Sequence, residues 1–136
     1  MNTASFSSLI ASAEEYLNPT EAEDRKSGDV AATLVTAAGT RYSGVCIDTP
    51  CGTGFCAEHA AIAAMVTAGE FRIAQIVAVW RDEAGALHVV SPCGRCREFI
   101  RQIDPANIDA QVILGPGRSA PLRDLLPEND WPAGTA

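Results

Sequence analysis

FCAEHAAIAAM, residues 55–65, is the stretch that decides the fold, and its partner is SPCGRCREF, residues 91–99. Each stretch has the composition of the first turns of a helix that opens on a cysteine. Cys93 and Cys96 are three residues apart, so both sulfurs would point to the same side of a first helical turn. The two stretches are therefore expected to bring cysteine thiols together at two helix starts.

These cysteines have the spacing of a metal site. A CxxC pair with one further thiolate, from Cys56, gives zinc three ligands and leaves a fourth position for water. Glu58 follows Cys56 by two residues, and such positions do not share a helix face, so Glu58 is not expected to bind the same metal. Water in catalytic zinc sites has a pKa near about 7. Glu58 would take that proton and pass it to a departing nitrogen.

Three thiolates around Zn²⁺ carry a net negative charge, which weakens the metal as a Lewis acid. Two features of the sequence offset this charge. Both cysteine stretches lie at expected helix N-termini, where the helix dipole favours anions. His59, Arg95 and Arg97 are close enough in sequence to donate hydrogen bonds to the sulfurs from outside the ligand set.

Three other interpretations of the cysteines stay open at this point. His59 could join the three cysteines in a closed, structural Cys₃His zinc site. Cys93 and Cys96 could be a redox pair, although such a pair is expected after an early strand of a βαβ unit and this one is late. Cys56 could be a small buried hydrophobe. Glu58 argues against the last, because a carboxylate on an apolar helix is costly to bury without a partner.

Composition narrows the class of protein. The 136 residues fit one domain, 1–136, and the odd count of five cysteines favours metal binding or catalysis over a disulfide framework. The formal charge of −7 argues against a nucleic-acid partner, since that binding depends on neutralising phosphates. We find no apolar run long enough to span a membrane, and residues 1–11 lack the pattern of a signal peptide. A cytoplasmic location is the default expectation.

The apolar patterns predict alternating helices and strands. Helices are expected near residues 6–17, 56–69, 92–103 and 121–126, and strands at 30–36, 41–47, 73–80, 87–90 and 111–114. Residues 20–29 read as a loop, Pro92 suits the first helical position, and the helix from residue 56 is apolar nearly all round, which predicts burial. This order predicts an α/β fold, a three-layer α/β/α domain with a five-stranded mixed sheet flanked by helices.

Cys56-Ala57-Glu58 together with Pro92-Cys93-Gly94-Arg95-Cys96 resembles the cytidine deaminase family, in particular its tri-cysteine, small-subunit branch. The two motifs are specific as a pair, and the resemblance extends over nearly the whole chain. Residues 91–99 and the segment from Leu125 to Trp131 resemble blasticidin S deaminases.

The resemblance implies hydrolytic loss of ammonia from a pyrimidine 4-amino group. It implies a homotetramer in which loops of neighbouring subunits complete each active site. Cys56, Cys93 and Cys96 match the zinc ligands and Glu58 matches the proton shuttle. His59 falls where some relatives place an arginine against the thiolates, with Arg95 nearby. Substrate contacts are expected from three more positions, Ala57, Pro92 and Trp131.

The residues at the positions expected to bind the sugar differ from those of the family. Relatives carry Asn-Val-Glu after the second strand, whose polar residues hold the ribose, whereas here the residues are Cys46-Ile47-Asp48. Relatives also place an aromatic ring before the first strand to flank the base, where this chain has Gly28. Asp48 is either a hydroxyl acceptor or a solvated loop residue, and Cys46 is a poor substitute for an amide.

The expected substrate is accordingly a small nucleoside, cytidine or a blasticidin S-like compound. The alternative substrates are free nucleobases or related azine rings. A structural zinc module without catalysis is the alternative from another class of protein. Editing of RNA or DNA is disfavoured by the acidic charge.

Overall fold

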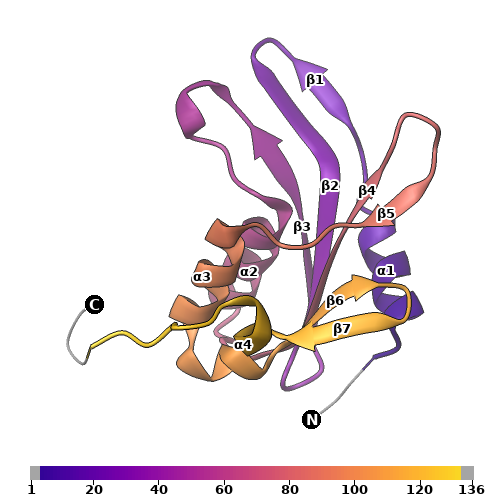
Figure 1. The fold of residues 1–136 in the computed structure, drawn as a ribbon. Helices are drawn as coiled ribbons and strands as arrows, with labels where there is room; N and C mark the ends of the chain where they lie inside the picture. Colours follow the sequence, from indigo (N-terminus) through magenta and orange to yellow (C-terminus); the bar gives the residue numbers. More distant parts are fainter. Residues whose placement is uncertain (1–3, 133–136) are drawn as a thin grey trace.

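A seven-stranded sheet runs through the part of the chain that this computed structural model describes, residues 4–132 of the expected 1–136 domain (Figure 1). The strands are β1 (Thr20–Ala22), β2 (Arg25–Thr36), β3 (Arg41–Asp48), β4 (Ile73–Arg81), β5 (Leu87–Val89), β6 (Gln111–Gly115) and β7 (Arg118–Pro121). The α-helices are α1 (Phe6–Glu14), α2 (Ala57–Thr67), α3 (Gly94–Ile103) and α4 (Leu122–Leu125), with short 3-10 turns η1 (Pro50–Gly52) and η2 (Pro105–Asp109).

Strand β4 is the centre of this sheet. It pairs antiparallel with β2 and with the short β5, and parallel with β6, so the sheet is mixed. Antiparallel neighbours can be joined by a short turn, but a parallel neighbour needs a crossover, and α3 provides it. Residues 73–79 of β4 are all buried, as the apolar run, interrupted only by Gln75, predicts.

Helices cover both faces of the sheet. Alternate β4 residues pack against opposite layers: Ile76 and Ala78 belong to the core under α2 and α3, whereas Val77 and Val79 belong to the core under α1. Figure 1 shows α1 on one side of the sheet and the other helices on the other. This arrangement confirms the predicted three-layer α/β/α fold. No helix within residues 4–132 is long and apolar enough to cross a membrane.

All five predicted strands are present, and two more, β1 and β7, were missed. The prediction of a loop over residues 20–29 is wrong, because β1 and the start of β2 form a hairpin there. Residues 20–26 are exposed on both faces of this hairpin, so they carry no apolar alternation from which a strand could be read. The segment before the last helix is also a strand, β7. The last helix is therefore shorter than the predicted 121–126 and spans only Leu122–Leu125.

Two helix predictions also need correction. Cys93 is the N-cap of α3, so Pro92 precedes the helix and does not occupy its first position. Helix α2 is not buried all round: Ala63, Ala64 and Val66 are exposed on its outer side. Alanine at most positions leaves the sequence without a periodic signal for which side of the helix packs.

Helix α2 lies very close to β3 because Gly44 has no side chain. A Cβ added at Gly44 would lie 2.4 Å from the Ala60 Cβ and 2.6 Å from the backbone nitrogen of Ala61. Ala57 and Ala61, both fully buried, continue this contact along the helix. The small residues of α2 and Gly44 together set the position of the helix start, which carries the candidate site.

Candidate active site

Three cysteine sulfurs meet where α2 and α3 begin. Cys56 is the N-cap of α2, Cys93 is the N-cap of α3, and Cys96 lies in the first turn of α3. The Sγ atom of Cys93 lies 3.5 Å from those of both Cys56 and Cys96, and all three sulfurs are within 4.8 Å of one another. Neither N-cap side chain makes a capping hydrogen bond, so both thiols are free to face the cluster.

This donor set fits zinc. Tetrahedral zinc with Zn–S bonds of about 2.3 Å holds its sulfurs about 3.8 Å apart, close to the spacing found here. Burial raises the pKa of the Cys56 and Cys96 thiols, and the nearby Glu58 charge raises that of Cys96 further. Burial opposes ionisation of Cys93 too, but hydrogen bonds, chiefly from the Cys96 backbone N–H, outweigh it and lower the pKa of Cys93. A bound cation deprotonates such thiols outright, and the two helix N-termini add favourable dipoles.

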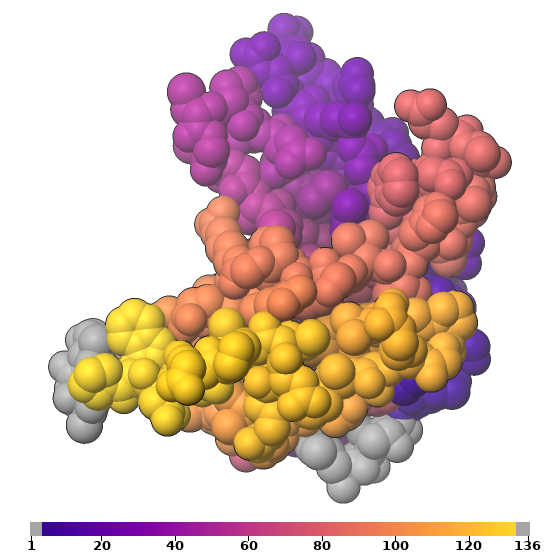
Figure 2. Space-filling view, in the orientation of Figure 1, coloured from indigo at the N-terminus to yellow at the C-terminus, as the bar shows by residue number. Residues whose placement is uncertain are grey.

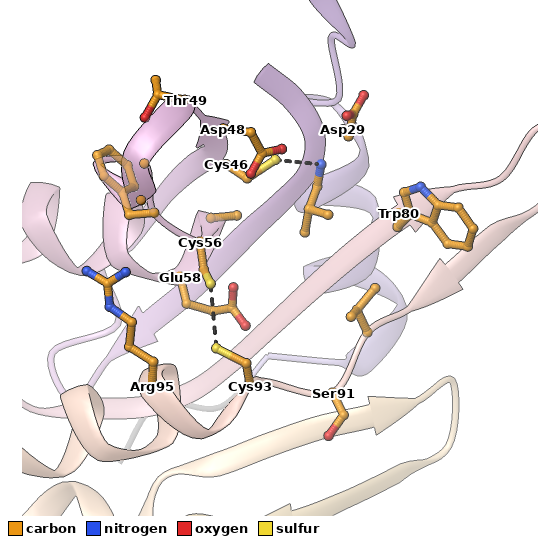
Figure 3. A pocket seen from close by; sticks show the side chains of 16 residues that line it. Asp29, Cys46, Asp48, Thr49, Cys56, Glu58, Trp80, Ser91, Cys93 and Arg95 are labelled. Atoms are coloured by element: carbon orange, nitrogen blue, oxygen red, sulfur yellow. Dashed lines mark hydrogen bonds between the residues drawn. The ribbon is translucent and has the colours of Figure 1, made fainter. Parts of the chain in front are cut away.

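Glu58 stands beside the sulfurs with its carboxylate directed into the cavity (Figure 3). It lies in the first turn of α2 and is only 6% exposed. Burial raises the pKa of this carboxyl, and a hydrogen bond from its own backbone N–H counteracts this only in part. A carboxyl group in this setting can hold a proton closer to neutral pH than an exposed one, as a proton carrier requires.

His59 contacts the thiol cluster from outside. Its Nδ1 lies 3.4 Å from the Cys96 Sγ, and its ring stacks on Phe99 at a centroid distance of 4.3 Å. Burial lowers the pKa of this imidazole, and the Arg95 charge lowers it further. His59 does not belong to the group of ligand atoms within 4.8 Å of one another among the described residues. The geometry therefore disfavours a closed Cys₃His site.

The two arginines of the second motif have different surroundings. Arg95 is exposed and lines the cavity, close enough to His59 to affect its charge. Arg97 was expected to be able to reach the sulfurs, but its guanidinium donates instead to the carbonyls of Pro92 and Leu125, at 2.9 and 3.1 Å. Arg97 thus fastens the C-terminal segment to the start of α3.

A cavity of about 560 Å³ opens in front of the thiols, between the middle of β2, the carboxyl ends of β3 and β4 and the starts of α2 and α3. Figure 2 shows the molecular face hollowed between the β2–β3 arm, the β4–β5 hairpin and α3. Cys46, Asp48 and Ala57, three of the residues expected to contact the substrate, line this cavity. Pro92 lies behind it, on a smaller cleft that Glu58 also borders.

Two further predicted substrate residues, Gly28 and Trp131, line neither this cavity nor the smaller cleft. Gly28 is buried inside β2 with φ +80°, and a Cβ there would lie 2.2 Å from the Asn18 Oδ1. The space beside Gly28 is therefore filled by Asn18, whose backbone N–H donates to the Gly28 carbonyl. Trp131 is 50% exposed, and its Nε1 donates to Glu98 on α3.

Asp29 and Trp80 are among the residues of the cavity wall that sequence reasoning missed. Asp29 immediately precedes the apolar part of β2, and Trp80 lies at the carboxyl end of the central strand. In α/β folds, ligands bind outside the carboxyl ends of strands. The position of Trp80 at the carboxyl end of a largely apolar strand was the available signal.

Comparison with known proteins agrees with the family resemblance of the two cysteine motifs. Residues 8–112 match the family model described as the cytidine and deoxycytidylate deaminase zinc-binding region. The cytidine deaminase of Burkholderia pseudomallei is similar at 26% identity, over 90% of this chain and 96% of that one, with a TM-score of 0.70.

Two mycobacterial structures share the fold. The cytidine deaminase of Mycobacterium leprae has 21% identity and a TM-score of 0.74, over 93% of this chain and 100% of that one. That of Mycobacterium tuberculosis has 23% identity and a TM-score of 0.73, over 93% of this chain and 97% of that one. No curated protein sequence matches the chain.

Proposed function

This chain belongs to the cytidine and deoxycytidylate deaminase family, and from that premise we propose that it removes the 4-amino group of a cytosine-type ring in a small nucleoside, releasing ammonia. Membership of this family makes the chain a zinc-dependent deaminase, whereas the identity of its substrate is what we propose. The observation that carries it is the buried Glu58 carboxyl beside three clustered thiols, at the floor of a cavity large enough for a nucleoside.

Each residue of the motif pair has a proposed role. Cys56, Cys93 and Cys96 would hold the zinc. Zinc in such a site supplies Lewis acidity that makes hydroxide available at neutral pH. Arg95 and His59 offset part of the thiolate charge, Arg95 by its nearby charge and His59 by the contact with Cys96.

Glu58 moves two protons in the proposed reaction. As the water oxygen bonds to ring carbon C4, Glu58 takes a proton from the water and delivers it to ring nitrogen N3. It then takes the remaining hydroxyl proton and delivers it to the amino group. The C4–N bond breaks, ammonia leaves, and C4 becomes a carbonyl carbon. The raised pKa of Glu58 supports a carboxyl group that carries a proton between these steps.

A free base or a related azine ring is the second candidate substrate, and Cys46 favours it. Its thiol is buried and already takes the backbone N–H of Val30 at 3.3 Å. A thiol is also a weak hydrogen-bond donor. Cys46 is therefore a poor hydrogen-bonding partner for a sugar hydroxyl. Asp48, which also lines the cavity, can still accept a hydrogen bond from one. Cytidine and a blasticidin S-like nucleoside remain the first candidates because the cavity exceeds the size of a base.

The test is ammonia release from cytidine and cytosine by the zinc-loaded protein and two variants. Glu58→Gln should keep the fold and the zinc but lose about 10²- to 10⁴-fold in kcat. Glu15→Gln, on the exposed end of α1, should behave as the unmodified protein. Turnover by Glu58→Gln within tenfold of the unmodified protein would refute the proton-shuttle role. No ammonia from either compound with the unmodified protein would refute the substrate class.

We further infer a homotetramer in which neighbouring subunits complete each cavity, in a reducing compartment such as the cytoplasm. The apolar outer side of α2, exposed in the single chain, supports a subunit contact. The five free cysteines support the reducing compartment. Sedimentation of the native protein tests the assembly, and a monomer with full activity would contradict it.

A further inference from the structure

The cavity extends well past the thiols, and its far end is aromatic. Trp80, near the end of β4, lines this end and keeps 40% of its surface exposed. Val30, its cross-strand partner on β2, lines the same wall, as does Val90 after β5. Figure 3 shows Trp80 across the cavity from Cys56 and Glu58, with Asp29 nearby. A large ring exposed in a cavity wall is suited to contact a ligand.

The Trp80 ring is held in place by its neighbours. It stacks on His88 of β5 at a centroid distance of 5.4 Å, and the two residues are paired across the strands. The His88 Nε2 lies 2.7 Å from the Asp82 Oδ2, and the other Asp82 oxygen accepts the Ala86 backbone N–H at 2.9 Å. A ring fixed in this way loses little conformational entropy when a ligand binds it.

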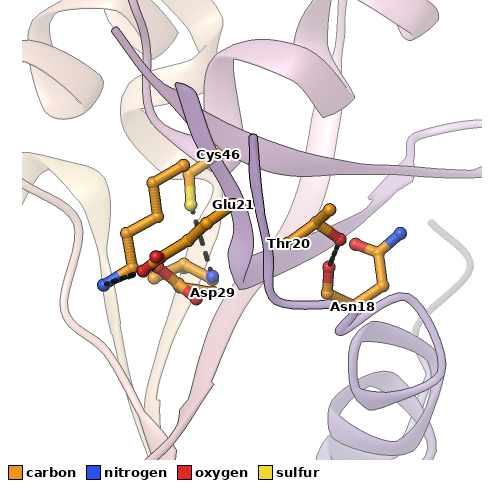
Figure 4. A network of polar contacts seen from close by, with 7 residues as sticks. Asn18, Thr20, Glu21, Asp29 and Cys46 are labelled. Atoms are coloured by element: carbon orange, nitrogen blue, oxygen red, sulfur yellow. Dashed lines mark hydrogen bonds and ion pairs between the residues drawn. The ribbon is translucent and has the colours of Figure 1, made fainter. Parts of the chain in front are cut away.

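Carboxylates accompany the ring. Asp29 and Asp48 both line the cavity, from β2 and β3. Lys26 lies 3.4 Å from Asp29 and 3.9 Å from Glu21 (Figure 4). It is also the cross-strand neighbour of Asp48. Glu21 and Asp29 thus share one ammonium group, and Asp48 adds a second carboxylate to the wall, which leaves this end of the cavity net negative. Arg95, a cationic residue that lines the wall, comes from the start of α3, at the end of the cavity that holds the thiols.

The geometry points to Trp80 as a specificity-determining residue that, with Asp29 and Asp48, forms a distal subsite for a positively charged substituent of the substrate. This inference rests on the proposed deamination. The thiols and Glu58 mark the place of ring carbon C4, and a substituent on N1, opposite C4 in the ring, points away from them into the rest of the cavity. A cation there gains the indole face and the carboxylates, whereas a phosphate meets like charges.

Three compounds that differ in one group test the subsite: cytidine, 5′-amino-5′-deoxycytidine and cytidine 5′-monophosphate. The ammonium compound should exceed cytidine in kcat/KM by about 3- to 30-fold, the range of a cation over an indole face. The phosphate compound should fall below cytidine. Added salt should shrink both differences, because it screens the exposed charges. Equal values for all three, or a preference for the phosphate, would overturn the subsite while leaving the deaminase proposal intact.

Variants test whether Trp80 and Asp29 cause the preference for the ammonium compound. Trp80→Ala should lower the ammonium-to-hydroxyl ratio towards one, and Trp80→Phe should retain part of it. Asp29→Asn should lower the ratio and improve the phosphate compound. The matched controls are Phe71→Ala and Asp24→Asn, both exposed and outside the cavity, which should leave the ratio unchanged. An unchanged ratio in Trp80→Phe and Asp29→Asn would overturn the assignment even if Trp80→Ala fails to fold.

Binding measurements distinguish the proposed subsite from the proposed deamination reaction. Calorimetric titration of the three compounds into zinc-loaded Glu58→Gln reads the order of affinity without turnover. The order ammonium, hydroxyl, phosphate would support the subsite even if none of the compounds releases ammonia, an outcome that would refute the proposed reaction. The reverse order would overturn the subsite, whatever the turnover.

Discussion

Gly44→Ala should damage activity because it acts on the position of α2. The added Cβ would lie 2.4 Å from the Ala60 Cβ, and ordinary contact begins at 3.4 Å, so helix and strand must separate by about 1 Å. The backbone nitrogen of Ala61 is also within 2.6 Å, and no side-chain rotation relieves that contact. Overpacking of this kind costs about 1–3 kcal/mol of unfolding free energy. A 1 Å shift of catalytic groups costs up to about 10²-fold in rate.

Thermal unfolding and ammonia release measure the two effects of Gly44→Ala. We expect Tm to fall by about 3–10 °C and kcat by about 10- to 100-fold. Ala60→Gly in the same chain should recover part of both, since it removes one of the close contacts. Gly117→Ala is the matched control, because a Cβ there meets no atom within 4 Å. A Gly44→Ala protein with unchanged Tm and kcat would refute the close-approach reasoning.

Four further changes follow from the site and the core. Cys93→Ala should lose most bound zinc and much soluble protein in metal analysis, and full occupancy would contradict its role as a ligand. His59→Ala should retain zinc, whereas loss of zinc would restore the closed four-ligand site. Asn107→Ala should lower the unfolding free energy by about 2–4 kcal/mol in urea titration, because it leaves the Ile73 N–H and two carbonyls without their partner; a change below 1 kcal/mol would contradict this. Deleting residues 128–136 should raise KM or loosen the assembly, and unchanged kinetics and oligomer size would assign Trp131 no part in either.

The part of the site that the sequence predicted is local in the chain. Cys93 and Cys96 are brought together by one helical turn, and Glu58 is placed beside Cys56 by the same helix start. Such spacings depend on helix geometry alone. The core strands were predictable for the same reason, because an unbroken or alternating apolar run follows from burial on one or both faces of a strand.

The cavity wall could not be predicted in this way, because it depends on how distant segments pair. The register between β2 and β3 shifts between Ser27 and Ala31, and this irregularity turns Gly28 towards Asn18 and away from the cavity. Trp80 reaches the cavity because β4 pairs with β2 in one particular register. No motif records either pairing, so no motif could show that Gly28 lies against Asn18 or that the Trp80 ring lines the cavity.

The position of β4 at the centre of the sheet also determines the order in which the chain folds and binds metal during its synthesis. Cys56 leaves the ribosome 37 residues ahead of Cys93, and β4 lies between them in sequence. The helix starts that carry these cysteines can meet only after β4 has docked on β2 and α3 has crossed over towards β6. Until then, a nascent chain offers zinc one isolated thiol or one CxxC pair, which is too few ligands for a stable site. Metal capture is therefore a late step of biogenesis, and it reports that both halves of the chain have folded together.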